Sequence, residues 1–97
     1  MKSIMIIFDQ AHYDSIVATL DRLECNGFTY LEHVMGQGTN GGDPHFGSHA
    51  WPSMNSAIIT VVEDVQVDEV LNELKALDLD RPQLGLRAFV WDIEKGI

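Results

Sequence analysis

The chain's clearest candidates for chemistry are two histidines, His45 and His49, which form an H-x-x-x-H pattern. On an α-helix this spacing would place both imidazoles on one face, as zinc ligands often require. Pro44 and Gly47 disfavour a helix at this point. The pair therefore predicts either a metal site formed within a turn or two solvated loop histidines, because short patterns also arise by chance.

The sequence offers two candidates for a third metal ligand beside this pair. Asp43 lies close before the pair, and His33 follows Glu32 on a predicted strand. Nitrogen and oxygen donors of this kind suit zinc or copper. His33 also has a structural interpretation, as a partly buried histidine hydrogen-bonded to its neighbour. The metal hypothesis thus names His45, His49 and His33 as ligands.

The same region is rich in glycine. Residues 36–51, GQGTNGGDPHFGSHAW, hold five of the chain's eight glycines. Backbone N–H groups in such a segment can bind anions, but GQGTNGGD lacks the Gly-Lys-Ser/Thr ending of a Walker loop. A long loop in a small chain is usually functional or disordered. We therefore expect this loop and its flanks to carry the binding function.

Strongly periodic segments must position these residues. Four short apolar segments are rich in β-branched and aromatic residues, which is typical of strands. Two segments between them repeat apolar residues at three- and four-residue spacing, which is typical of amphipathic helices. Asn26 and Gly27 are expected to end the first helix, since both tolerate the left-handed conformation. The strands are predicted at residues 3–8, 28–35, 54–62 and 86–93, and the helices from Tyr13 to Leu23 and from Glu63 to Leu77.

The predicted order β-α-β-β-α-β defines the fold class. It indicates an α+β, ferredoxin-like sandwich, in which an antiparallel sheet carries both helices on one face. A long loop joins the second and third strands. Apolar residues occur at both parities of the strands, so the second face also needs a cover, and oligomerisation would provide it. Trp91 is expected in the core or in that interface.

Length and charge restrict the function further. With 97 residues, we expect one domain over residues 1–97. The net charge of −9 disfavours nucleic acid and anionic membranes as partners. No apolar run approaches the roughly 20 residues that span a bilayer, so no membrane insertion is expected. The single cysteine, Cys25, suits a reducing compartment, and we expect a cytoplasmic protein.

No catalytic set emerges from the remaining titratable residues. The carboxylates are scattered, without an apolar pair that could serve as general acid and base. No acid, histidine and nucleophile combination stands out, and His12 receives no role. Cys25 lies near the end of a predicted helix, where the dipole disfavours a thiolate, and is interpreted as a small core residue. An enzyme is therefore the least favoured class of function.

Several segments, taken in order, resemble the PII signal-transduction proteins over nearly the whole chain. MKSIMIIF and the following NGFT resemble the family's first strand and the start of its second. VMGQGTNGG resembles the entry to the family's T-loop, and TVVEDVQVDEVLNELKAL resembles its third strand and second helix. GLRAFVWDI resembles the last strand. No single motif is highly specific, but the ordered set is moderately so.

The resemblance implies a homotrimer whose sheets face inward and whose clefts between subunits bind a small effector. It also implies a flexible T-loop, here residues 36–53, that reports the effector to a target protein such as a membrane transporter or an enzyme. It implies no chemistry of its own. Gly36, Gly38 and Arg87 match the positions that would contact the effector.

Two departures from the family pattern matter. Residues 38–53 contain no tyrosine, whereas the T-loop of well-known members carries a modifiable one. Arg87 stands where those members have a lysine, and their downstream basic residues have no counterpart. Phosphate binding requires several cations or backbone donors, so we expect weak binding of an adenine nucleotide or a different effector. The alternative function is a transition-metal sensor linked to metal efflux or tolerance, which uses the loop histidines.

Overall fold

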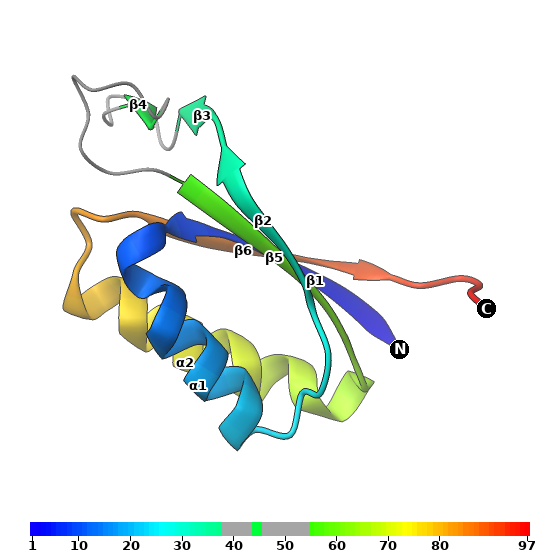
Figure 1. Cartoon of the computed structure of the whole chain (residues 1–97). Helices are drawn as coiled ribbons and strands as arrows, with labels where there is room; N and C mark the ends of the chain where they lie inside the picture. The colour runs from blue at the N-terminus through cyan, green and yellow to red at the C-terminus, as the bar shows by residue number, and fades with distance from the viewer. Residues whose placement is uncertain (38–43, 46–54) are drawn as a thin grey trace.

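The computed structural model describes residues 1–37, 44–45 and 55–97. The predicted order of strands and helices is confirmed, with two 3-10 turns and a short two-stranded ribbon added to it (Figure 1). The elements are β1 (Lys2–Asp9), η1 (Gln10–His12), α1 (Tyr13–Arg22), β2 (Thr29–Val34), β3 (Gly36–Gln37), β4 (Pro44–His45), β5 (Asn55–Val62), η2 (Asp64–Gln66), α2 (Val67–Asp80) and β6 (Leu86–Asp92).

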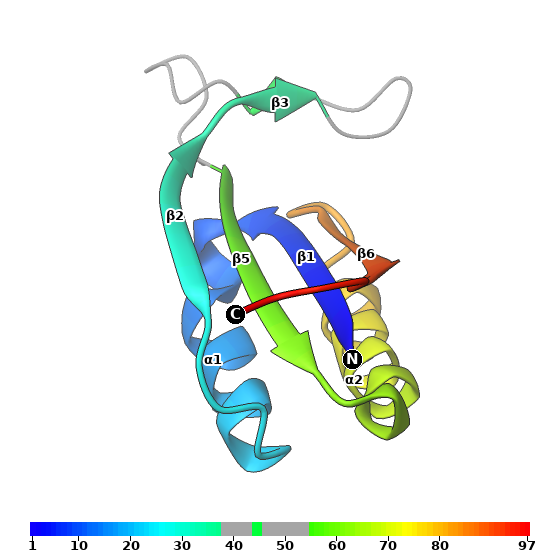
Figure 2. The same cartoon turned by 90° about the vertical axis from the view of Figure 1, so that its right-hand side faces the viewer.

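Four of the strands form one antiparallel sheet in the order β2-β5-β1-β6. β1 pairs with both β5 and β6 in continuous register, so that Ile6 lies opposite Ile58 of β5 and Ala88 of β6. Both α1 and α2 lie on one side of this sheet, and in the part of the chain that the structure describes the other side carries no helix (Figures 1 and 2). The α+β ferredoxin-like fold is therefore confirmed.

The core lies between the sheet and the two helices. Alternate residues of β1 point to the helices, as the two-residue period of a strand requires. The helices contribute one apolar stripe each, spaced by four residues. The fully buried residues on these faces include Ile4, Ile6 and Phe8 of β1, Ile16 and Leu20 of α1, and Val70 and Leu74 of α2.

Each helix is entered through a 3-10 turn with its own cap. Before η1, the Asp9 side chain accepts a hydrogen bond from the backbone N–H of Ala11 at 2.8 Å. Before η2, Glu63 and Gln66 form a capping box, in which the Gln66 side chain accepts from the Glu63 backbone N–H at 2.9 Å. These bonds satisfy N–H groups that a helix start leaves without partners. They fix where the chain turns from each strand into the helix layer.

The end of α1 differs from the prediction. Gly27 has the positive φ expected of it, 94°, but the left-handed residue that ends the helix is Glu24, with φ of 60°. The Cys25 N–H donates to the Leu20 carbonyl at 2.8 Å and the Glu24 N–H to the Asp21 carbonyl at 3.0 Å, which is the bonding of a Schellman motif. The motif ends the helix at Arg22 and turns Cys25 into the core, where it is 4% exposed. The prediction of Cys25 as a core residue is confirmed.

The second helix ends later than predicted, at Asp80 rather than at Leu77. The N–H of Arg81 donates to the Leu77 carbonyl at 3.3 Å and closes the last turn. Gly85 then adopts a φ of 81° just before β6 begins. Among the described residues, no helix is long and apolar enough to cross a membrane.

Candidate functional site

The proposed binding residues that the structure describes, Gly36, Arg87, His33 and His45, lie at one end of the main sheet or in the ribbon that continues from it. Since the strands are antiparallel, β1 and β2 end where β5 and β6 begin. We call this the loop end of the sheet and define it by Asp9, Val34, Asn55 and Leu86. The ribbon β3–β4 continues from β2 at this end (Figures 1 and 2).

Within one chain the structure does not bring Gly36 and Arg87 together. Gly36 follows β2 at one edge of the sheet, and Arg87 lies at the start of β6 at the opposite edge. Three strand spacings of about 4.8 Å separate the two edges by roughly 14 Å. Gly38 lies outside the described residues. A ligand that contacts both edges of one chain would have to span this distance.

The guanidinium of Arg87 has a nearby carboxylate, but some of its N–H donors are free to bind a ligand. Its Nη1 lies 3.7 Å from Oδ2 of Asp78 and donates to the Leu86 carbonyl at 2.9 Å. The side chain is half exposed. A guanidinium has five N–H donors, so donors remain for an anion. Because Asp78 offsets part of its charge, Arg87 alone makes a weak phosphate site.

The exit of β2 is held by a contact that the sequence analysis missed. The β2–β5 register shifts between Leu31 and Val34, which marks a bulge. The Glu32 carbonyl in this bulge accepts two hydrogen bonds, from Ser56 Oγ at 2.6 Å and from Gln10 Nε2 at 3.0 Å. These bonds fix the direction in which the chain leaves the sheet. The signal in the sequence is weak, because Ser56 is one of three polar residues, with Asn55 and Thr60, in the mainly apolar strand β5.

The candidate metal ligands are only partly described. His33 lies on β2 with its side chain exposed, and its Nε2 is 3.9 Å from Oε1 of Glu32. The structural interpretation of His33 as partly buried is therefore wrong. His45 belongs to β4, where its backbone pairs with Gly36. His49 lies outside the described residues, and within the described ranges no group of three ligating side chains could hold a metal.

Two buried titratable groups also lie at the loop end. Asp9 is 3% exposed and His12 is 5% exposed. Within the part of the chain that the structure describes, Nε2 of His12 has no hydrogen-bond partner. A buried polar atom without a partner costs about 1–3 kcal/mol. His12, to which the sequence analysis assigned no role, is thus a structurally unusual residue beside the site.

Cys25 is unsuited to nucleophilic chemistry. Burial raises the pKa of its thiol, and the carboxylate of Glu69 raises it further. Its Sγ contacts the Leu23 carbonyl at 3.8 Å. A thiol with a raised pKa is largely protonated at neutral pH and a poor nucleophile.

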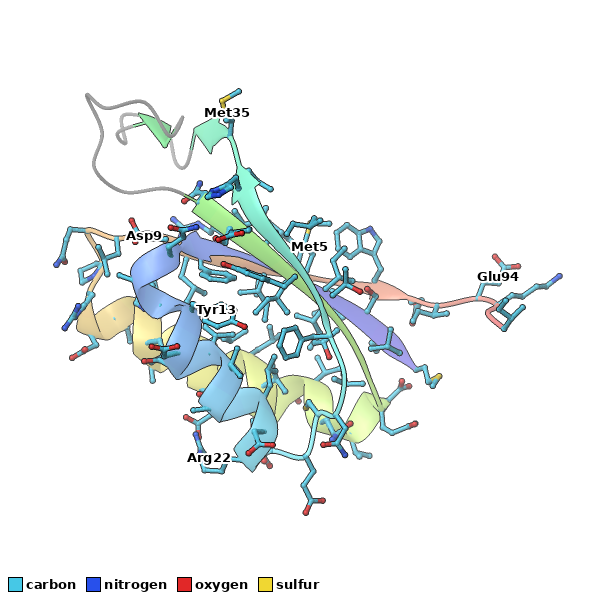
Figure 3. The ribbon with its side chains drawn as sticks, viewed as in Figure 1. Met5, Asp9, Tyr13, Arg22, Met35 and Glu94 are labelled. Carbon is cyan, nitrogen blue, oxygen red and sulfur yellow. The ribbon has the colours of Figure 1, made fainter. Side chains whose placement is uncertain are left out.

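The face of the sheet without helices is apolar and exposed. Met5 of β1 lies opposite Ile59 and Phe89, and Ser3 lies opposite Trp91, so these residues share one face (Figure 3 labels Met5). Phe89 is 52% and Trp91 is 50% exposed, which excludes Trp91 from the core of the chain. We call this surface the open face. A contiguous apolar surface of this kind marks an interaction site.

The structure defines a small ferredoxin-like protein with an exposed apolar sheet face and with Gly36 and Arg87 at opposite edges of the loop end. The family model for nitrogen regulatory protein P-II matches residues 1–96. The chain therefore belongs to the nitrogen regulatory protein P-II family. No curated protein matches the chain in sequence.

Solved structures of PII-like proteins share the fold. CPII of Thiomonas intermedia K12, solved with ADP and bicarbonate bound, is 25% identical, with a TM-score of 0.78 over 95% of this chain and 84% of that one. A PII-like signalling protein of Thermus thermophilus is 21% identical, with a TM-score of 0.66 over 93% and 83%. A DUF3240 family protein of Shewanella baltica OS155 is 18% identical, with a TM-score of 0.66 over 98% and 92%.

Proposed function

We propose that this protein is a PII-like regulator without catalytic activity that works as a homotrimer. It binds a small effector between subunits and regulates a target protein, a transporter or an enzyme, through residues 36–53. Residues 1–97 act as one domain in this assembly. The observation that carries the proposal is the position of Gly36 and Arg87, at the same end of the sheet but at opposite edges.

The open face supports the assembly. Its aromatic side chains are half exposed in the single chain, and burying apolar surface stabilises by about 25 cal/mol per Å². A closed oligomer covers identical surfaces of all its subunits at once. Packing open faces together would also bring the β2 edge of one chain near the β6 edge of the next, so that Gly36 and Arg87 of different subunits flank one cleft.

The effector we propose is an adenine nucleotide, such as ADP or AMP, or bicarbonate. The support is CPII, which shares the family fold and was solved with ADP and bicarbonate. Backbone N–H groups near Gly36 and Gly38 would contact the anion, and Arg87 would supply the charge. Well-known members of the family have several basic residues at this site, whereas this chain has one partly neutralised guanidinium, that of Arg87. We therefore expect the protein to bind ATP more weakly than AMP or ADP.

Native mass spectrometry of the metal-stripped protein tests this proposal. The spectra are recorded alone and with ATP, ADP, AMP or bicarbonate. A trimer that takes up three effector molecules supports the proposal, and Arg87→Met is expected to weaken uptake about tenfold or more, since it removes a charged hydrogen-bond donor. Arg22→Met is the matched control, because Arg22 pairs with Glu73 at 3.3 Å in the helix layer. Monomers, or equal losses in both variants, would contradict the proposal.

A metal-handling function is the alternative proposal, and one observation favours it. The β3–β4 pairing places the backbone of His45 opposite Gly36, directly after the strand that carries His33. Zinc or copper added to the same samples tests it. Uptake that disappears in the variant with His45→Ala and His49→Ala, while the trimer persists, would support this alternative. Uptake that survives both substitutions would show that the ligands are wrong.

A further inference from the structure

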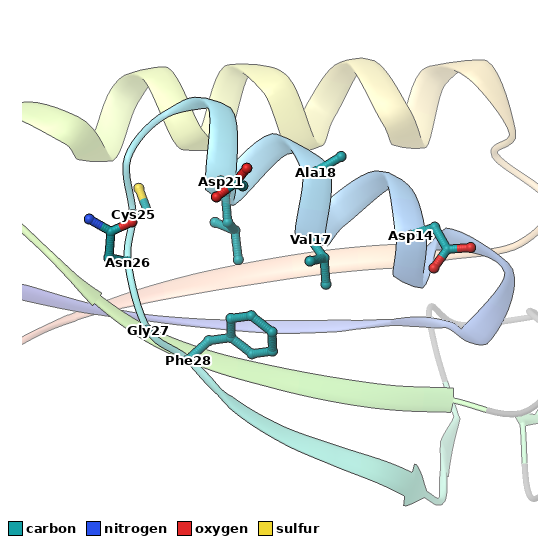
Figure 4. A pocket seen from close by; sticks show the side chains of 9 residues that line it. Asp14, Val17, Ala18, Asp21, Cys25, Asn26, Gly27 and Phe28 are labelled. Carbon is teal, nitrogen blue, oxygen red and sulfur yellow. The ribbon is translucent and has the colours of Figure 1, made fainter.

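A groove lies between α1 and the segment that leads from it into β2. Its volume is about 360 Å³, which falls within the range of small-molecule sites. Val17 points from α1 toward the ring of Phe28, and both side chains line the groove (Figure 4). Phe28 is 38% exposed. The groove therefore offers an open apolar floor with one aromatic ring.

An acidic residue stands at each end of this floor. Asp14 lies in the first turn of α1 and Asp21 in its last, and both line the groove (Figure 4). Seven residues make about two helical turns, so the two side chains share a face and lie roughly 10 Å apart along the axis. This distance is too long for one metal ion, whose oxygen ligands lie about 2–2.6 Å away.

Neither carboxylate has a counter-charge in the described part of the chain. The cationic side chain nearest in sequence, Arg22, is 3.3 Å from Glu73 on α2 instead. Asp21 also stands near the carbonyl end of the helix, where the dipole favours a cation. The groove thus combines two separated negative charges with apolar surface between them.

We propose that this groove binds a linear aliphatic polyamine of about the length of spermidine. Its terminal ammonium groups are about 11 Å apart in the extended molecule, close to the spacing of roughly 10 Å between Asp14 and Asp21 along the helix. The methylene groups would pack on Val17 and Phe28. An inner ammonium would lie near the ring of Phe28, where a cation–π contact adds to the attraction.

This site does not depend on the proposed regulatory function. The groove is formed by α1 and residues 25–28, on the side of the sheet that carries the helices. The open face and Arg87 contribute nothing to it. Polyamine binding and nucleotide binding can therefore fail or succeed separately.

Titration of the full chain with spermidine at low ionic strength tests the proposal, because exposed ion pairs are screened by salt. Binding is measured by calorimetry and located by the NMR shifts of backbone amides. We expect the amides of Val17, Asp21 and Phe28 to shift most. Shifts spread evenly over the acidic surface would overturn the proposal.

The matched variants separate the groove from the general negative charge. Asp14→Asn or Asp21→Asn should weaken binding about threefold each, and the pair of substitutions about tenfold, as for exposed ion pairs. Asp68→Asn with Asp80→Asn removes the same charge from α2 and should change the affinity less than twofold. Equal losses in the two double variants would show diffuse attraction to a chain of charge −9 and overturn the proposal.

A length series and one floor variant complete the test. Butane-1,4-diamine is too short to reach both carboxylates and should bind about tenfold more weakly than spermidine. Phe28→Leu keeps an apolar floor but removes the ring, and should weaken spermidine binding about threefold. Equal affinity for the short and long amines would contradict the bridging geometry, and an unchanged affinity of Phe28→Leu would contradict the contact with the ring.

Discussion

The two faces of the one sheet have very different surroundings. On the helix face, Ile6 and Phe8 are fully buried by α1 and α2 of the same chain. On the open face, Phe89 and Trp91 are about half exposed, although they belong to the same sheet and are equally apolar. The contrast teaches that, within the described residues, the helices cover one face of the sheet only. The stability of the single chain should therefore depend on the first face, and assembly on the second.

The largest expected effect comes from the helix face. Phe8→Ala removes a fully buried ring and should lower the free energy of unfolding by about 3–5 kcal/mol. Urea unfolding followed by circular dichroism measures this, at fixed protein concentration because oligomers gain stability by mass action. A loss below about 1 kcal/mol would show that the helix face is not the core of the chain.

The next effect belongs to the open face. Phe89→Glu should abolish assembly while the single chain stays folded, because an uncompensated charge in an apolar interface costs several kcal/mol. Analytical ultracentrifugation gives the oligomeric state, and circular dichroism confirms the fold. Leu79→Glu is the control, since Leu79 is exposed on α2, in the helix layer. If both variants assembled alike, the open face would not be an interface.

A smaller effect tests the end of α1, within the helix layer. Glu24 holds a left-handed conformation that costs a residue with a Cβ about 1–2 kcal/mol. Glu24→Gly should therefore stabilise the chain by about 0.5–1 kcal/mol, after the greater entropy of glycine in the unfolded chain is subtracted. Glu24→Ala keeps the strain and should not stabilise. Urea unfolding distinguishes the two variants, and neither should change assembly.

The smallest effect concerns the N-terminus. A hydrogen bond from the α-amino group of Met1, at 2.9 Å, and then the charge of that group lower the pKa of Asp64. A carboxyl group with a lowered folded-state pKa stabilises the fold above its unfolded pKa and loses that contribution as pH falls through the folded value. Between pH 6 and pH 2 the urea midpoint of unfolding should therefore fall slightly less in Asp64→Asn than in the unchanged protein. An identical pH dependence would show that this pair does not couple to folding.

Periodicity predicted the elements well, and local backbone detail poorly. The apolar run of residues 3–8 predicted β1, and the structure shows that its alternate residues Ile4, Ile6 and Phe8 form the buried face. Asn26 and Gly27 were expected to end α1, and Gly27 does have a positive φ of 94°, but the residue that ends the helix is Glu24, with φ of 60°. Local preference favoured the amide and the glycine, but the hydrogen bonds that end α1 and the burial of Cys25 determine the turn.

For the candidate site too, the sequence predicted some features and missed others. The sequence identified Gly36 and Arg87 through the segments that resemble PII proteins, but not that opposite edges of the sheet separate them. It could not place His33 either, because a bulge between Leu31 and Val34 interrupts the alternation of β2. The hydrogen bonds of Ser56 and Gln10 to Glu32 join residues distant in sequence, which no local pattern reveals.

By itself, the sequence determined the order of strands and helices, the apolar stripe of each helix and the family, since hydrophobic period and ordered motifs are local properties of the chain. The tertiary structure alone decided which candidate residues share an edge, that the aromatic residues of β6 remain uncovered, and that Asp14 and Asp21 flank an apolar groove. These features depend on strand order and on packing between distant segments. They arise only when the whole chain has folded, because each requires groups that chain connectivity leaves far apart.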